Sequence, residues 1–170
     1  MTKTGWRVII VNDDPSQLKR IARIVEQEQG NALTFCRAAD ALAHIAQYPD
    51  VDLVITDLHM PGIDGWRFCH LLRSSGFPST NKTPILVLSA TASLENTDKM
   101  PLDAGADAFL SLPYTVDELQ QTIRQLLRHP RQETHLTLLA IETDAQVRAE
   151  IAARFGERGY CVFQASTVSQ

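Results

Sequence analysis

Short, continuous aliphatic runs alternate along this chain with longer segments in which apolar residues recur every three or four positions. Runs without polar alternation are typical of parallel strands covered on both faces, whereas the three-to-four spacing predicts amphipathic helices. Five such strands alternate with five helices, which predicts an α/β fold with a doubly wound, five-stranded parallel sheet. The predicted strands are 6–11, 32–36, 53–57, 85–88 and 107–111, and the predicted helices are 15–29, 38–46, 66–72, 93–104 and 115–128.

Two of the predicted helices have clear start signals. Asp14 reads as an N-cap, with Pro15 at the first helical position and Gln17 as a capping-box partner, and Gly30 is expected to close this helix. Thr115 and Glu118 have the spacing of a second capping box. These signals place both helices directly after strands.

The predicted helix at 93–104 is the weakest of the five. Asn96, Thr97 and Asp98 are poor helix formers, and Pro101 is expected to kink or break the element. We expect this helix to be short or irregular.

Composition narrows the class of protein. With 170 residues, 44% hydrophobic content and a net charge of −4, the chain can bury a core, and without a Lys/Arg run it does not resemble a nucleic-acid-binding module. Cys36, Cys69 and Cys161 show no disulfide or zinc spacing, and the five histidines show no metal-ligand pattern, so a reducing cytoplasmic setting fits best. No apolar run has membrane length, and no signal-peptide pattern opens the chain.

Polar side chains gather at the carboxyl ends of the predicted strands. Asn12 and Asp13 follow the first strand, Asp57 ends the third, and Ser89 follows the fourth. In an open parallel sheet these ends converge on one edge, where chemistry is found. The plainer alternative, that Asp57 only caps a turn rich in proline and glycine, is the ordinary reading of a lone loop aspartate.

Several motifs in register carry a resemblance to a known family. They are Val11-Asn12-Asp13-Asp14-Pro15, the segment from Asp57 to Gly65 (DLHMPGIDG), Ser89-Ala90, and the segment from Gly105 to Leu110 (GADAFL) that leads to a proline. Over about residues 5–128 the chain resembles the receiver domain of two-component response regulators, which has a flavodoxin-like fold.

The resemblance implies roles for these residues. Asp57 would accept a phosphoryl group from a histidine kinase, and Mg²⁺ would be held by Asp13, Asp57 and the backbone carbonyl of His59. Two carboxylates and a carbonyl suit Mg²⁺, which prefers hard oxygen ligands and keeps several waters. Ser89 would be the switch hydroxyl and Phe109 the aromatic that moves with it. The alternatives are a plain strand-terminal serine and a plain core phenylalanine.

Two residues depart from the family pattern. Asn12 stands where one of two acidic residues is usual, and it can still hold a metal-bound water through its amide oxygen. Leu112 replaces the usual lysine, so a charge-assisted hydrogen bond of about 1.5–3 kcal/mol is lost. Because a nearly complete two-state switch takes about 5.5 kcal/mol, we expect phosphorylation to switch this chain only in part. Neither Lys82 nor Lys99 follows a strand.

Beyond a predicted linker at 129–134, the chain resembles its own beginning. The segment from Leu138 to Arg148 loosely parallels residues 9–18, and Tyr160 to Ala165 parallels the second strand. Residues 135–170 are therefore interpreted as a partial second receiver-like β-α-β segment, in which Thr143 takes the place of Asp13. The alternative is a tail helix with a coincidental strand.

Our leading hypothesis is a phosphorelay receiver that is no enzyme beyond its own phosphorylation and slow autodephosphorylation. Its partners would be a histidine kinase or phosphotransfer protein, a downstream effector, and a second copy of the chain as a further option, with no direct nucleic acid or membrane contact. The output face would be built by the fourth helix, fifth strand and fifth helix. One alternative is a phosphorylation-independent pseudo-receiver that acts as an interaction or dimerisation module. A hydrolase with Asp57 as nucleophile is disfavoured, because His59 stands where a second acid-base carboxylate is needed.

Overall fold

A computed structural model describes residues 5–89, 105–128, 137–141, 143–156 and 161–166 of the chain. It divides into two compact units, Met1–Gln132 and Glu133–Gln170. The predicted helix at 93–104 and the predicted linker at 129–134 lie outside the described residues.

The first unit contains the predicted five-stranded parallel sheet, with strand order β2-β1-β3-β4-β5. The prediction of a doubly wound parallel sheet is therefore confirmed. Within the described ranges, no helix is long and apolar enough to cross a membrane. The elements are β1 (Trp6–Val11), α1 (Pro15–Gln27), β2 (Gly30–Phe35), α2 (Ala38–Gln47), β3 (Leu53–Asp57), α3 (Gly65–Leu72), a 3₁₀ turn (Pro78–Thr80), β4 (Ile85–Ser89), β5 (Ala108–Ser111) and α5 (Val116–Arg128).

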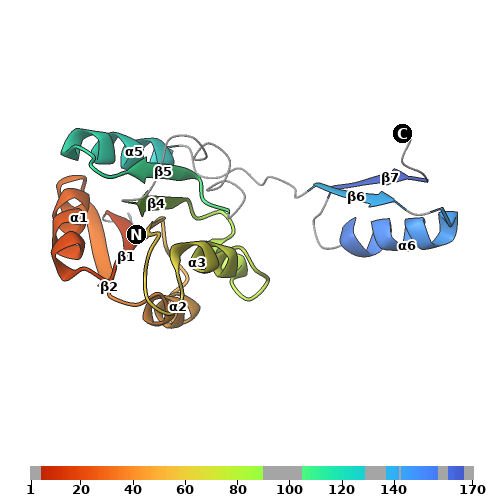
Figure 1. The fold of residues 1–170 in the computed structure, drawn as a ribbon, viewed down its shortest axis with the longest axis horizontal. Coiled ribbons are helices and arrows are strands. Elements are labelled where there is room, and N and C mark those ends of the chain that lie inside the picture. The colour runs from red at the N-terminus through yellow and green to blue at the C-terminus, as the bar shows by residue number, and fades with distance from the viewer. Residues whose placement is uncertain (1–4, 90–104, 129–136, 142, 157–160, 167–170) are drawn as a thin grey trace. The chain divides into compact units, whose positions relative to one another are not determined.

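Helices cover both faces of this sheet, with α1 and α5 on one side and α2 and α3 on the other (Figure 1). The strands alternate between the two cores. Leu53 and Ile55 of β3 face the α1/α5 core, whereas Val54 faces the α2/α3 core. Because both faces are covered, most residues of the central strands are buried, and these strands need no polar alternation.

The turn between α1 and β2 differs from the prediction. Helix α1 ends at Gln27, and the left-handed residue of the turn is Gln29, with φ of 61°. Gly30 is instead the first residue of β2, two residues before the predicted strand start. A Cβ at Gly30 would lie 2.5 Å from the Val25 side chain, so this glycine permits close packing of strand against helix.

The N-cap predictions are confirmed for Asp14 and Thr115, with one correction. Asp14 caps α1 by accepting the N–H of Ser16 at 2.7 Å, but its own N–H donates to Asn12 Oδ1 at 2.8 Å. Asn12 therefore accepts the Asp14 N–H that the predicted capping-box partner, Gln17, would have accepted. At α5, Glu118 and Thr115 exchange both capping-box hydrogen bonds, at 2.7 and 3.2 Å.

A buried arginine ties three segments together at the amino-terminal edge of β4 and β5. Arg73, just past α3, pairs with Asp107 at 2.7 Å, and the two side chains are only 13% and 16% exposed. The same Asp107 oxygen accepts the N–H of Ile85 at 2.7 Å. The guanidinium also donates to three backbone carbonyls, those of Thr80 (2.7 Å), Thr83 (2.9 Å) and Gly105 (2.9 Å).

The second unit is a single β-α-β element made of β6 (Thr137–Ile141), α6 (Ala145–Gly156) and β7 (Cys161–Ala165). Its two strands pair in parallel. Asp144 caps α6 by accepting the N–H of Gln146, two residues further along the chain, at 2.8 Å. Asp14 accepts the N–H of Ser16 in the same way at the start of α1. The predicted β-α-β extension is therefore present, and its first turn uses the same kind of cap as the start of the chain.

Candidate functional site

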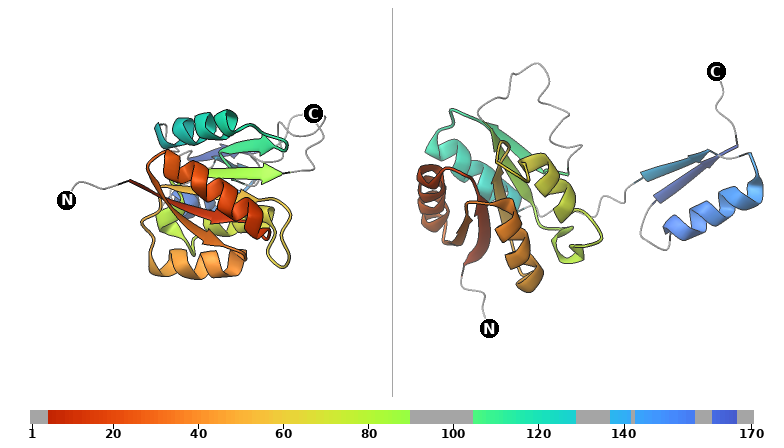
Figure 2. Two further views of the ribbon diagram at one scale, coloured as in Figure 1. Left: turned by 90° about the vertical axis from the view of Figure 1, so that its left-hand side faces the viewer. Right: turned by 60° about the horizontal axis from the view of Figure 1, so that its bottom comes forward.

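The five strands of the first unit are parallel, so their carboxyl ends lie at one edge of the sheet (Figure 2). Strand register aligns the predicted residues at this edge. Val11 is opposite Thr56, so the next residues, Asn12 and Asp57, are neighbours across β1 and β3. Asp57 is in turn opposite Leu88, which places Ser89 one position further along β4. The structure thus brings Asn12, Asp57 and Ser89 to the same edge.

Asp57 is half-buried at the end of β3, on the same side of the sheet as Leu53 and Ile55. Its Oδ1 accepts the N–H of Leu58 at 2.8 Å. Burial raises the pKa of Asp57; the Leu58 hydrogen bond lowers it in part, and the negative charge of Asp13 raises it further. The Asp57 carboxylate therefore experiences both burial and the negative charge of Asp13 at this edge.

This raised pKa predicts that Asp57→Asn stabilises the metal-free fold at neutral pH. The folded protein binds the Asp57 proton more tightly than the unfolded chain does, so stability falls as pH rises from the ordinary value of 3.8 through the raised folded pKa. The amide oxygen can still accept the Leu58 N–H, while the charge is removed. Thermal melts in chelator-treated buffer should show a higher Tm for the variant at pH 7 and a smaller difference below pH 3.8. A variant no more stable than wild type at pH 7 would contradict this account.

Asn12 and Asp13 differ in their surroundings. Asn12 is buried, 6% exposed, and its Oδ1 already accepts the N–H of Asp14, which leaves one acceptor position on that oxygen. Asp13 is exposed, and its charge reaches Asp57. No cluster of three or more His, Cys, Asp or Glu side chains suited to a metal occurs among the described residues. Two neighbouring carboxylates with mutual repulsion still fit a hard divalent cation that takes its other ligands from carbonyls and water.

The loop between β3 and α3 approaches the site at Gly65. The Gly65 N–H donates to the carbonyl of Leu58 at 2.9 Å. A Cβ on Gly65 would overlap the carbonyl oxygen of Asp57 and lie 2.9 Å from the Cα of Leu58. Glycine is therefore required for α3 to begin directly against the backbone of Asp57. The sequence indicated only a strand break and a helix start here.

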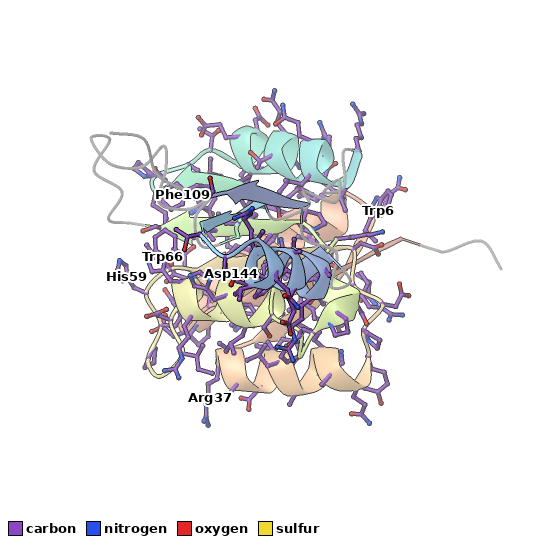
Figure 3. The ribbon with its side chains drawn as sticks, turned by 90° about the vertical axis from the view of Figure 1, so that its right-hand side faces the viewer. Trp6, Arg37, His59, Trp66, Phe109 and Asp144 are labelled. Carbon is purple, nitrogen blue, oxygen red and sulfur yellow. The ribbon has the colours of Figure 1, made fainter. Side chains whose placement is uncertain are left out.

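His59 lies within this loop and Trp66 in the first turn of α3, and Figure 3 shows both on the margin of the first unit. His59 is exposed, while Trp66 is partly buried and packs against the α2/α3 core. Both the charge and the backbone N–H of His59 act to lower the pKa of Asp57. His59 therefore lies close to Asp57, as the predicted metal site requires.

The predicted switch residues lie on β4 and β5. Ser89 is fully buried, and its carbonyl accepts the N–H of Leu112 at 2.8 Å. Phe109 is partly buried and packs against the α2/α3 core, whereas Leu112 packs against the α1/α5 core. Leu112 therefore adds apolar surface on the side of the sheet that Asp57 faces. Lys82 precedes β4, at the opposite edge, and Lys99 lies outside the described residues.

Sequence reasoning missed Tyr114, which it treated only as part of a tight exit from β5. The side chain is 5% exposed and belongs to the α1/α5 core. Its hydroxyl oxygen is buried and has no hydrogen-bond partner within the described part of the chain. The guanidinium of Arg20 lies over the ring, 5.0 Å from its centroid, and donates to the Tyr114 carbonyl at 3.4 Å. A tyrosine in an otherwise apolar run was the available signal, because buried tyrosine hydroxyls usually have a partner.

Comparison with known proteins adds independent information. A sequence model of the family described as "Response regulator receiver domain" matches residues 8–124. The chain is similar to the transcriptional regulatory protein TcrA of Mycobacterium tuberculosis, with 34% identity over 126 residues, or 74% of this chain and 47% of TcrA. It is also similar to the transcriptional regulatory protein PcoR of Escherichia coli, with 32% identity over 127 residues, or 75% of this chain and 54% of PcoR. The chain thus spans about half the length of these curated relatives.

Solved structures agree with these matches. The chemotaxis response regulator CheY4 of Vibrio cholerae aligns with a TM-score of 0.65 and 27% identity, covering 73% of this chain and all of CheY4. A putative response regulator from Chloroflexus aurantiacus aligns with a TM-score of 0.67 and 26% identity, covering 74% of this chain and 99% of that protein. Both alignments extend over about the same share of the chain as the curated matches.

Proposed function

The chain belongs to the response regulator receiver domain family of two-component signalling, and from this membership we propose that it accepts a phosphoryl group on Asp57. The observation that carries the proposal is the position of the Asp57 carboxylate. It lies half-buried at the carboxyl end of a central strand, within reach of the charge of Asp13. A carboxylate kept partly out of water beside a second carboxylate is suited to metal-assisted nucleophilic attack.

Mg²⁺ is the cofactor that this site suits. Asp13, Asp57 and the His59 carbonyl would hold it, with Asn12 contributing through a bound water. When bound, the cation would reduce the repulsion between the carboxylates and the incoming phosphate. Because Asn12 replaces a carboxylate and already accepts the Asp14 N–H, we propose weaker Mg²⁺ binding than two acidic residues at this position would provide.

We propose that the change at Asp57 passes through Ser89 and Phe109 to the surface around β5 and α5. Ser89 is buried one position beyond the residue opposite Asp57, which supports a role for its hydroxyl. Phe109 is only partly buried, so its ring has room to change position. The partners on this reading are a histidine kinase or phosphotransfer protein upstream and an effector downstream, with self-association as a further option.

Intact-mass spectrometry after incubation with Mg²⁺ and acetyl phosphate tests the phosphoacceptor. Wild type should gain one phosphoryl group, and Asp57→Asn should gain none, because the amide lacks the nucleophilic oxygen. Asp64→Asn is a matched control, since Asp64 is the exposed N-cap of α3 at the end of the loop that follows β3. This substitution should leave labelling intact. Labelling of Asp57→Asn, or none of folded wild type, would exclude Asp57 as the acceptor.

The second candidate function is a phosphorylation-independent interaction module. The packing of Leu112 into the α1/α5 core favours it, because an apolar side chain there cannot pair with a phosphoryl group. Folded wild type that neither forms the adduct nor binds Mg²⁺ at millimolar concentration would support this candidate over the first.

We propose further that residues 5–128 form the receiver, 129–134 a linker, and 135–170 the opening of a second receiver-like domain. The parallel β6-α6-β7 element and the cap at Asp144 support this division. Thr143 would then replace the metal carboxylate Asp13, so this segment would not be a phosphoacceptor on its own.

A further inference from the structure

The Tyr114 hydroxyl is an unexplained polar group in an otherwise apolar core. Burying a hydroxyl without a hydrogen-bond partner costs stability, whereas phenylalanine would fill the same space without that cost. Yet the oxygen is shielded from solvent and has no partner among the residues that the structure describes. Such a group is explained if its partner is present only in another state of the protein.

Strand alternation and packing place Tyr114 on the same side of the sheet as Asp57. Tyr114 belongs to the same α1/α5 core as Leu53 and Ile55, and Asp57 follows Ile55 by two residues on β3. Leu112, two residues before Tyr114, packs in the same core. The cation of Arg20 over the ring holds its position from the α1 side.

The electrostatics agree with this placement. Burial raises the pKa of Tyr114, the cation of Arg20 lowers it in part, and the negative charge of Asp57 raises it further. Tyr114 therefore remains protonated at neutral pH, and its hydroxyl can donate a hydrogen bond to an acceptor oxygen.

We infer that the Tyr114 hydroxyl donates a hydrogen bond to the phosphoryl group during its transfer to Asp57. This inference rests on the proposed function, phosphorylation of Asp57. The Tyr114 hydroxyl acts on the side of the sheet where Leu112, which replaces the usual lysine, has no side-chain hydrogen-bond donor. Ser89 belongs by strand alternation to the opposite side, with Ile85 and Val87. The phosphoryl group would then have one hydroxyl donor from each layer of the fold.

The step itself is an ordinary displacement at phosphorus. An Asp57 carboxylate oxygen forms the new bond to the phosphorus of acetyl phosphate, and the bond from phosphorus to the acetate oxygen breaks with its electron pair. Acetate leaves, and the tyrosine keeps its proton throughout. Tyr114 contributes by donating to a phosphoryl oxygen while negative charge is redistributed, which is the role of a preorganised hydrogen-bond donor.

Tyr114→Phe removes only this hydroxyl, so it separates the inferred role from packing. We expect the variant to melt at or above the wild-type Tm, because an unsatisfied buried hydroxyl is lost. The rate constant for adduct formation with acetyl phosphate and Mg²⁺ should fall about tenfold, as for the loss of one hydrogen bond to a charged group. Tyr48→Phe is the matched control, since Tyr48 is exposed at the end of α2, and its rate should equal that of wild type.

A second readout does not depend on the variant. In protein labelled with ¹³C at the tyrosine Cζ, the Tyr114 signal is assigned by elimination with Tyr48→Phe and Tyr160→Phe, the other two tyrosines of the chain. Phosphorylation of wild type should shift the Tyr114 signal and leave that of Tyr48 in place.

The outcomes separate this inference from the proposed function. A normal adduct on wild type, with an unchanged rate in Tyr114→Phe and an unmoved Tyr114 signal, overturns the inference alone. An equal slowing in Tyr48→Phe also overturns it. Absence of any adduct on folded wild type overturns both, and the scaffold candidate then remains.

Discussion

Arg73→Ala is expected to lower the free energy of unfolding by about 3–5 kcal/mol, as for removal of one partner of a buried ion pair. The substitution removes the Arg73 guanidinium from the Asp107 carboxylate, which is only 16% exposed. It also removes the donor to the carbonyls of Thr80, Thr83 and Gly105. Since small domains are stable by about 5–15 kcal/mol, such a loss is a large share of the total. Urea denaturation monitored by circular dichroism measures it through the shift in midpoint.

Arg124→Ala is the matched control for this prediction. Arg124 makes two hydrogen bonds of 2.6 Å to Glu28, so the contact is as short as the Arg73 pair. Its side chain is 52% exposed, however, and exposed ion pairs typically contribute about 0.2–1 kcal/mol. Equal losses in the two variants would show that burial does not set the strength of the Arg73 contact.

Gly65→Ala is expected to disturb the candidate site by displacing the backbone of Asp57. The new methyl would meet the backbone of Asp57 and Leu58, which cannot rotate away as a side chain can. Overpacking of this kind costs about 1–3 kcal/mol. A displacement of the reacting group by about 1 Å can slow a reaction about a hundredfold, and we expect a loss of that order in the rate of adduct formation.

Gly76→Ala controls for the general effect of adding a methyl to a loop glycine. There the nearest atom to the new Cβ would be the Ser74 side-chain oxygen at 3.5 Å, an ordinary contact. Stability and labelling rate should match those of wild type. If Gly65→Ala labels as fast as Gly76→Ala, the backbone of Asp57 tolerates the contact and its position is not critical.

Much of the fold was predictable because the central strands are short aliphatic runs and two of the helices have clear start signals. The capping box of Thr115 and Glu118 is one such signal, since both partners lie within one turn. Predictions failed where a contact forms only after distant elements pack, or where another residue competes for the same hydrogen bond. Gly30 was interpreted as a helix terminator because its contact with Val25 arises only after strand and helix pack. Gln17 lost its expected bond because Asn12 provides a nearer acceptor for Asp14.

The location of the candidate site at one edge of the sheet was predictable, because the carboxyl ends of parallel strands converge there. Its details were not. The pairing of Arg73 with Asp107 joins residues 34 positions apart, and neither side chain marks its partner in the sequence. The buried hydroxyl of Tyr114 likewise becomes visible only when its surroundings are known. Roles assigned by resemblance to Ser89, Phe109 and the metal ligands remain predictions until labelling and binding are measured.

The location of the Arg73 network has a mechanical meaning. It fastens β4 and β5 at their amino-terminal ends, whereas Asp57, Ser89 and Leu112 lie toward the opposite ends of the strands. One edge of the sheet is therefore held together by side-chain hydrogen bonds, and the proposed site lies at the other edge. If Asp57 is phosphorylated as proposed, the Arg73 contacts would keep the amino-terminal ends of β4 and β5 together while their carboxyl ends adjust.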